Sequence, residues 1–274
     1  MSQINPLQKY YRQPKLFVNL PSKGLYYEPG NLKGDYNNMP IFGMTGMDEI
    51  IFKTPDALFN GEASSKVIES CCPYISDARS MPSIDVDAIL VAIRMATYGE
   101  TMSFTSTCSN CNAENDFDVD LKNIVEYYSA QSFDNTVQVN SEITVKIRPL
   151  TYDELNSFSL ENFKLQRMLF QISGMPEADQ QQHLDDIYKK LAEIQVQLFM
   201  LSIDSVQTPD GVVQDYELIR DWLQNSDRDI YNIIKNRLEE NKKVWSIPKQ
   251  HTKCDSCGHE SHIEITMDQS NFFG

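Results

Sequence analysis

Two Cys-x-x-Cys pairs constrain the fold of this chain more than any other feature. The first pair is Cys108 and Cys111, and the second is Cys254 and Cys257. Each pair lies between short segments that alternate apolar and polar residues, which is typical of strands. Four thiolates are the complete ligand set of a closed structural zinc site. The sequence therefore predicts one structural, non-catalytic zinc ion bound by Cys108, Cys111, Cys254 and Cys257.

The spacing of the two pairs is unusual for a zinc ribbon. A compact ribbon has about 15–20 residues between its pairs, whereas 142 residues separate Cys111 from Cys254 here. One shared site then requires that the intervening residues form a domain whose ends return close together. Two alternatives stay open: four reduced thiols without metal, or a site in which His259 or His262 replaces one cysteine.

Composition and charge narrow the classes of function. The chain has 274 residues, 41% of them hydrophobic, and a net charge of −15. A negative surface repels phosphate backbones, so nucleic-acid binding is disfavoured. The chain has no apolar run long enough for a membrane span and no signal-peptide pattern at its N-terminus. We therefore expect a cytoplasmic protein whose cysteines are metal ligands or buried thiols rather than disulfides.

The N-terminal half shows turn and helix signals. Residues 1–15 are polar and predict an arm, and residues 16–27 predict a hairpin that turns at Pro21-Ser22-Lys23-Gly24. Thr54 and Pro55 predict the N-cap and first position of a helix. A second helix is expected from near Asp85 to Gly99, because apolar residues recur there at helical spacing.

Patterns after Gly99 alternate between strand and helix. Residues 101–121 and 136–147 show period-two alternation, and each predicts a pair of strands. Thr151 and Glu154 have the spacing of a helix capping box. An apolar stripe runs through the long helix expected between 184 and 201. The stripe comprises Leu184, Ile187, Tyr188, Leu191, Ile194, Leu198 and Leu201.

These patterns together predict an α+β fold: a split zinc-ribbon-like β module with an inserted helical subdomain. Residues 1–15 form the arm. Residues 16–149 and 246–274 form the α+β module that carries the split zinc site. Residues 150–245 form the inserted helical subdomain.

Other motifs are interpreted as structural. Cys71 and Cys72 are adjacent and lack a histidine partner, so we expect buried thiols rather than a nucleophile. The segment Pro21-Ser22-Lys23-Gly24 lacks the consensus of a phosphate-binding loop. The acidic pairs Asp48-Glu49 and Asp85/Asp87 resemble catalytic carboxylates, but acidic residues at helix starts more often serve the helix dipole.

Several of these segments resemble those of a known family. They are Leu20-Pro-Ser-Lys-Gly-Leu-Tyr26, Thr107-Cys-Ser-Asn-Cys111, Pro149-Leu-Thr-Tyr-Asp153 and Lys253-Cys-Asp-Ser-Cys-Gly258. They are similar to those of the baseplate hub assembly proteins of T-even-type contractile-tailed bacteriophages. The resemblance covers most of residues 16–267.

The resemblance implies a non-enzymatic protein that builds the baseplate hub through contacts with other hub proteins, so no catalytic residue is assigned. It implies action in the host bacterial cytoplasm during assembly, either as a component retained in the virion tail baseplate or as a chaperone-like assembly factor. No nucleic acid, membrane or small-molecule substrate is implied.

Two other classes stay open at this point. A zinc-ribbon nucleic-acid-binding or transcription-associated protein would need a basic patch despite the net charge of −15. A metalloenzyme would need an open coordination position and a nearby general base.

Overall fold

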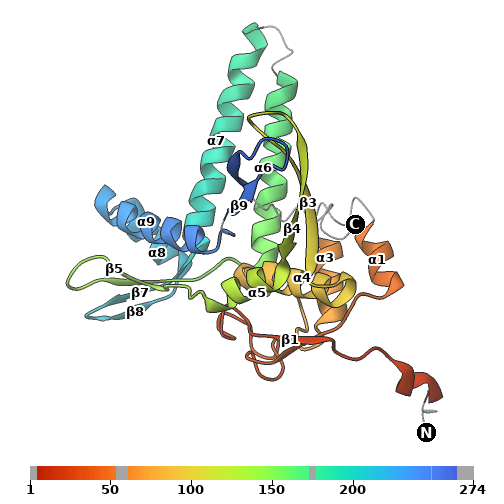
Figure 1. Ribbon diagram of the computed structural model, residues 1–274. Coiled ribbons are helices and arrows are strands. Elements are labelled where there is room, and N and C mark those ends of the chain that lie inside the picture. The colour runs from red at the N-terminus through yellow and green to blue at the C-terminus, as the bar shows by residue number, and fades with distance from the viewer. Residues whose placement is uncertain (1–4, 54–60, 173–176, 248, 264–274) are drawn as a thin grey trace. The chain divides into compact units, whose positions relative to one another are not determined.

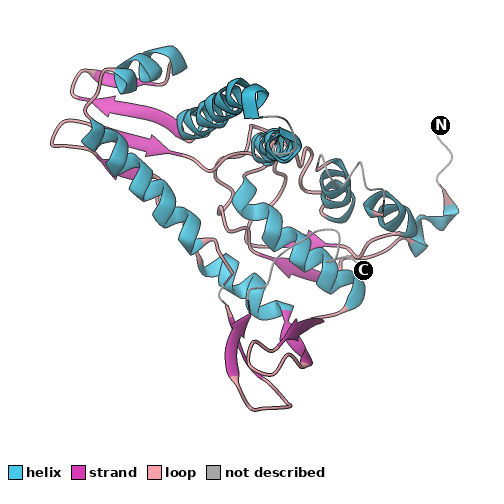
Figure 2. Ribbon diagram, turned by 90° about the horizontal axis from the view of Figure 1, so that it is seen from above, coloured by secondary structure: helices cyan, strands magenta, loops and turns pink. Residues whose placement is uncertain are grey.

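The protein is mixed α/β in a computed structural model that describes residues 5–53, 61–172, 177–247 and 249–263 (Figure 1). It divides into two compact units, the first of residues 1–131 and 247–274 and the second of residues 132–246. Strands form small antiparallel sheets with helices around them (Figure 2). The predicted helix start at Thr54 and Pro55 lies outside the described residues.

Within its described residues, the first unit contains three separate two-stranded sheets, in which β1 pairs with β2, β3 with β4, and β9 with β10. Its helices and strands, in chain order, are η1 (Pro6–Tyr10), β1 (Leu16–Val18), β2 (Met39–Ile41), α1 (Gly46–Phe52), α3 (Glu62–Cys71), α4 (Ser83–Tyr98), β3 (Thr101–Thr107), β4 (Glu114–Asp120), α5 (Leu121–Ala130), β9 (Gln250–Lys253) and β10 (Glu260–Ile263).

Helix α4 is the central element of the first unit. Most of its residues between Asp85 and Ala96 are buried, including the consecutive run from Ala88 to Ile93. A helix that is apolar on nearly all sides is stable only when other elements cover it. Gly99 ends the helix with φ +101, as the sequence predicts, because glycine tolerates this backbone conformation.

The predicted hairpin over residues 16–27 is wrong. β1 pairs with β2, so Phe17 lies opposite Pro40 rather than opposite a residue just after the turn. The turn itself is present, and Gly24 adopts φ +75 within it. Tyr26 also has a positive φ of 68, which no strand residue adopts. The chain therefore leaves the turn as a loop.

The predicted arm is attached to the first unit through Arg12. One guanidinium nitrogen of Arg12 donates to the Ser70 backbone oxygen at 2.7 Å. The other nitrogen donates to the Gly43 backbone oxygen and lies 3.3 Å from the Asp48 carboxylate. Asp48 in turn forms a capping box with Thr45 at the start of α1, which was not predicted from the sequence. Arg12 thus joins three segments that lie far apart in the sequence.

The second unit contains a four-stranded antiparallel sheet of order β5-β6-β7-β8. Its elements, in chain order, are β5 (Thr136–Gln138), β6 (Thr144–Ile147), α6 (Tyr152–Ile172), α7 (Glu177–Leu201), β7 (Ile203–Thr208), β8 (Gly211–Val213), α8 (Tyr216–Gln224) and α9 (Arg228–Val244). Side chains of the sheet, α8 and α9 share one apolar core. None of the helices described is long and apolar enough to cross a membrane.

The four-stranded sheet places the hairpin of residues 136–147 in the second unit. The sequence assigned these residues to the cysteine module, but β6 pairs with β7, whose strand the sequence did not predict. Buried and exposed residues do not alternate along β7, because Ser205 and Val206 are both buried. The register of the β6–β7 pairing also shifts, between Lys146 and Ile147 of β6. These irregularities remove the period-two signal on which the recognition of a strand depends.

Helices α6 and α7 form an antiparallel hairpin (Figure 1). Buried and partly buried apolar residues form a seam between the two helices. The seam residues recur at spacings of three, four or seven, as in a coiled coil. They are Phe158, Leu165, Leu169 and Ile172 in α6, and Leu184, Ile187, Leu191, Ile194 and Leu198 in α7. The capping box at the start of α6 is confirmed, because Thr151 and Glu154 exchange backbone-to-side-chain hydrogen bonds.

Candidate metal centre

The structure brings the four predicted ligands together. Their sulfur atoms all lie within 4.8 Å of one another. The Sγ atoms of Cys108 and Cys257 are 3.8 Å apart, and those of Cys111 and Cys254 are 3.6 Å apart. Sulfurs placed tetrahedrally at about 2.3 Å from zinc have edges of about 3.8 Å, whereas a disulfide bond is only about 2.0 Å long. The two closest sulfur pairs therefore have the separation expected in a tetrahedral four-thiolate site, and all four sulfurs are near enough to bind one ion.

The two cysteine turns have the same local structure. In each, the N–H of the first cysteine donates to the backbone oxygen five residues later, Ala113 or His259, at 2.9 Å. The residue four positions after that cysteine, Asn112 or Gly258, donates back to it and has a positive φ. Asparagine and glycine tolerate this conformation best. Each pair is thus presented by an equivalent turn at the end of a two-stranded hairpin, β3–β4 or β9–β10.

Backbone donors favour the thiolate form in the second turn. The N–H of Cys257 is the main cause of the lowered pKa of Cys254, which falls to about 6 although desolvation opposes it. The N–H of His259 lowers the pKa of Cys257 in the same way. Metals bind the thiolate rather than the thiol. The turn geometry therefore lowers the free energy needed to prepare these sulfurs for a cation.

Asn115 also connects the two turns, and the sequence gave no signal for it. Its buried side chain accepts a hydrogen bond from the Asp255 N–H at 2.9 Å and donates to the Ala113 oxygen at 2.9 Å. The Asn110 amide lies 3.6 Å from the Cys257 sulfur across the cluster. Alternation around Asn115 predicts only a strand, so its bridging role appears only when both turns are seen together.

Neither alternative histidine belongs to the sulfur cluster. Within the described residues, the cluster consists of the four cysteines alone. His259 Nε2 lies 3.5 Å from Ser109 Oγ, and the His262 ring contacts the ring of His251 on the neighbouring strand. The donor set is therefore four sulfurs, which suits a soft or borderline cation such as zinc.

Cys71 and Cys72 are fully buried, as the sequence predicted. Desolvation, followed by the nearby Asp48 carboxylate, raises the pKa of Cys71 to about 11. Desolvation likewise raises the pKa of Cys72 to about 12. A thiol with so high a pKa is protonated near neutral pH, and thiols are poor nucleophiles. These two cysteines pack in the core and have no role at the sulfur cluster.

The interpretation of Asp85 as only a helix-dipole residue is incomplete. Its carboxylate is fully buried and accepts hydrogen bonds from the Ser22 N–H at 2.7 Å, the Ser22 hydroxyl at 2.5 Å and the Tyr27 hydroxyl at 2.8 Å. Asp85 therefore holds the Pro21-Ser22-Lys23-Gly24 turn against α4. The Ser22 N–H is already paired with a carboxylate, which further disfavours the phosphate-loop interpretation of this turn.

The described residues thus define a mixed α/β protein with a four-cysteine cluster joining two distant parts of the sequence. A comparison with protein families matches residues 44–274 to the model described as T4 bacteriophage base plate protein. Because the match covers most of the chain, the protein belongs to this family. No curated protein and no solved structure matched the chain.

Proposed function

We propose that this chain is a non-enzymatic structural or assembly protein of the phage baseplate hub, acting through contacts with other tail proteins. The family match over residues 44–274 carries the proposal, because members of a baseplate family belong to the tail. The net charge of −15 supports protein partners over nucleic acid. The hub, rather than another part of the baseplate, is favoured by the sequence motifs that resemble hub assembly proteins.

We further propose that Cys108, Cys111, Cys254 and Cys257 hold one structural zinc ion in a zinc-ribbon-like arrangement. The sulfur distances and the matching turns support this role. Four protein ligands close the coordination sphere, so the ion stabilises the fold and leaves no position for a substrate. Zinc binding would join the segment around β3–β4 to the one around β9–β10.

Complementation tests the assembly role. A phage with a nonsense mutation in this gene should produce no complete baseplates by electron microscopy, and a plasmid copy of the wild-type gene should restore them. A plasmid copy of the Cys254→Ser variant should restore fewer complete baseplates than the wild-type copy. Ser256→Ala in the same turn is the matched control and should restore as many as wild type. Complete baseplates without any copy of the protein would refute the assembly role. Mass spectrometry of purified particles shows whether the protein stays in the virion.

Elemental analysis tests the metal separately. We expect one zinc ion per chain in wild-type protein and in Ser256→Ala, and almost none in Cys254→Ser. Metal content that is the same in wild-type and Cys254→Ser protein would exclude a shared four-cysteine site.

A further inference from the structure

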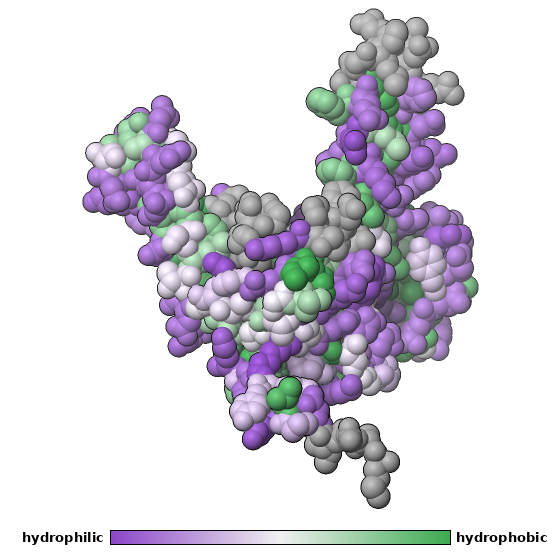
Figure 3. Space-filling view, turned by 90° about the vertical axis from the view of Figure 1, so that its right-hand side faces the viewer, coloured by the Kyte–Doolittle hydropathy of each residue, from purple (hydrophilic) through white to green (hydrophobic). Residues whose placement is uncertain are grey.

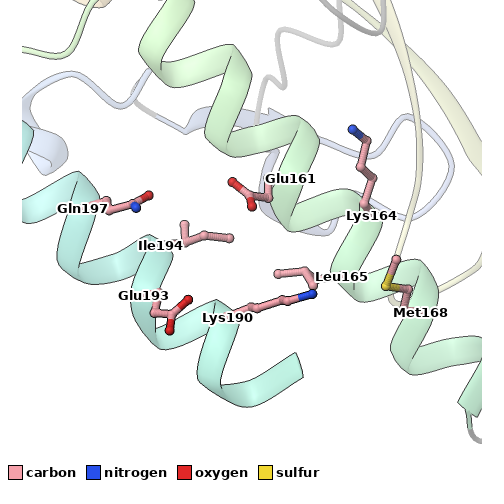
Figure 4. A pocket seen from close by; sticks show the side chains of 8 residues that line it. All are labelled: Glu161, Lys164, Leu165, Met168, Lys190, Glu193, Ile194 and Gln197. Carbon is pink, nitrogen blue, oxygen red and sulfur yellow. The ribbon is translucent and has the colours of Figure 1, made fainter. Parts of the chain in front are cut away.

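The α6–α7 hairpin carries a groove on one flank, beside its apolar seam (Figure 4). Leu165, Met168 and Ile194 supply the apolar lining of the groove. Charged or polar side chains supply the rest: Glu161 and Lys164 from α6, and Lys190, Glu193 and Gln197 from α7. The groove thus combines an apolar strip with charges of both signs.

The size and exposure of the groove favour a protein occupant. Its volume is about 260 Å³, which is below the roughly 300–1,000 Å³ typical of small-molecule sites. Met168 is 47% exposed. Methionine is enriched in protein interfaces, so its exposure here favours a protein partner. A two-helix seam covers only one stripe of each helix, so the flank stays open. In Figure 3, hydrophobic and hydrophilic side chains lie next to each other on the hairpin, near the top of the view.

The charges follow the same order on both helices. We define the base of the hairpin as the end where α6 begins and α7 ends, and the tip as the opposite end. Along α6, Glu161 lies closer to the base than Lys164. Because α7 runs in the opposite direction, Glu193 also lies closer to the base than Lys190. On each helix, therefore, the groove is acidic toward the base and basic toward the tip.

A groove with this polarity is complementary to itself after a half turn. A two-fold axis perpendicular to the hairpin places the tip side of one copy over the base side of the other. Lys164 and Lys190 of each copy then face Glu161 and Glu193 of the second copy. In such a symmetric contact every ion pair occurs twice. Flanking charges of this kind set partner choice and orientation in helical bundles.

We propose that two copies of this chain associate through the α6–α7 groove as an antiparallel, four-helix contact. The occupant is a second copy of the chain because the acidic end of one groove meets the basic end of another when the two hairpins are antiparallel. This self-association is independent of the proposed baseplate role and of the metal.

Sedimentation velocity over a concentration series tests the proposal with charge reversals. Wild-type protein should dimerise. Lys164→Glu/Lys190→Glu makes the groove wholly acidic, and Glu161→Lys/Glu193→Lys makes it wholly basic. We expect each double variant to dimerise at least about tenfold more weakly, because attraction between the copies becomes repulsion. An equimolar mixture of the two variants should form a heterodimer.

Two further variants separate the groove from general charge effects. Arg167→Glu/Lys189→Glu changes the net charge by the same amount as the acidic variant, but its exposed sites lie outside the groove lining, and it should dimerise like wild type. The quadruple reversal of Glu161, Lys164, Lys190 and Glu193 restores the net charge and the complementarity, so it should dimerise again. Circular dichroism checks that each variant keeps its helices.

Three results would overturn the proposal. Wild-type protein that is monomeric at every concentration would show that the groove does not bind a second copy and would favour a helix of another protein as its partner. A dimer that survives both double reversals would place the contact elsewhere. A mixture of the two double variants that stays monomeric would show that their charges do not meet.

Discussion

The first unit and the α6–α7 hairpin of the second unit are held together by different kinds of contact. In the first unit, the sulfur cluster, Asn115, Asp85 and Arg12 join segments that are far apart in the sequence. The α6–α7 hairpin depends on a repeating apolar seam between two consecutive helices. The first arrangement concentrates stability in a few polar groups, whereas the second distributes it over many side chains.

This difference predicts different responses to damage. A polar group that joins distant segments has no substitute, so its loss leaves several buried partners unsatisfied. A seam residue shares its role with its neighbours, and its loss costs the packing of one side chain. Both tryptophans, Trp222 and Trp245, lie in the second unit, so tryptophan fluorescence reports on that unit alone.

Metal removal should have the largest effect. A chelator should lower the calorimetric melting temperature of the first unit strongly, because binding to a structural zinc site contributes roughly 10 kcal/mol or more. The melting transition seen by tryptophan fluorescence should stay in place. Equal shifts of both transitions would show that the two units unfold together, and no shift in either would exclude a structural metal.

Ile187→Ala should have the next largest effect on stability, and this effect should be on the second unit. Ile187 is buried in the seam and does not line the groove. Removing its side chain should destabilise the hairpin by about 3 kcal/mol. Denaturation followed by tryptophan fluorescence measures the change, with the exposed Lys189→Ala as control. A shift confined to the first unit would contradict the independence of the seam.

Asp85→Ala should destabilise the first unit by about 2–3 kcal/mol, because it leaves the buried Ser22 donors and the half-buried Tyr27 hydroxyl without their acceptor. Asp85→Asn should destabilise the first unit less than Asp85→Ala. The amide keeps one acceptor oxygen, and the Ser22 and Tyr27 hydroxyls can accept hydrogen bonds from its NH2 group. Calorimetry of both variants measures the difference. Equal losses for alanine and asparagine would show that packing volume, not hydrogen bonding, determines the role of Asp85.

Asp85 should also give the first unit a measurable pH dependence. Desolvation raises the pKa of Asp85 from 3.8 to about 6, against the opposing hydrogen bonds from Ser22 and Tyr27. The folded state therefore binds the proton more tightly than the unfolded chain, and this contribution to stability is lost as pH rises from about 4 through about 6. Asp85→Asn should remove that slope from melting curves, and an unchanged slope would assign it to other groups.

Gly24→Ala should have the smallest effect, about 1–2 kcal/mol. Gly24 has φ +75, and an added Cβ would lie 3.2 Å from the Tyr36 ring. The exposed Gly30 has a positive φ and open space around it, so Gly30→Ala is the matched control for backbone strain alone. Calorimetry compares the two. An equal loss at both glycines would show that contact with Tyr36 adds nothing.

Local signals predicted the local elements well. The Thr151 capping box, the strands around Cys108 and Cys111, and the Gly99 helix end are all present. The α7 stripe is present except for Leu201, which is outside the seam, and Tyr188, which is exposed. Each depends on residues only a few positions apart, which a single sequence displays directly. The β1 partner was missed because strand pairing joins segments whose separation carries no local signal. Strand β7 was missed because its burial does not alternate regularly.

The sequence by itself determined the cysteine turns, the Thr151 capping box and the helical stripes, because spacing along one chain decides which side chains share a face or a turn. Only the tertiary structure decided that the four sulfurs lie within 4.8 Å of one another, that Asp85 binds the Ser22 turn, and that β6 pairs with β7. It also decided which flank of the α6–α7 hairpin presents a self-complementary groove. These contacts join distant residues, and their energies depend on burial and geometry that arise only after folding.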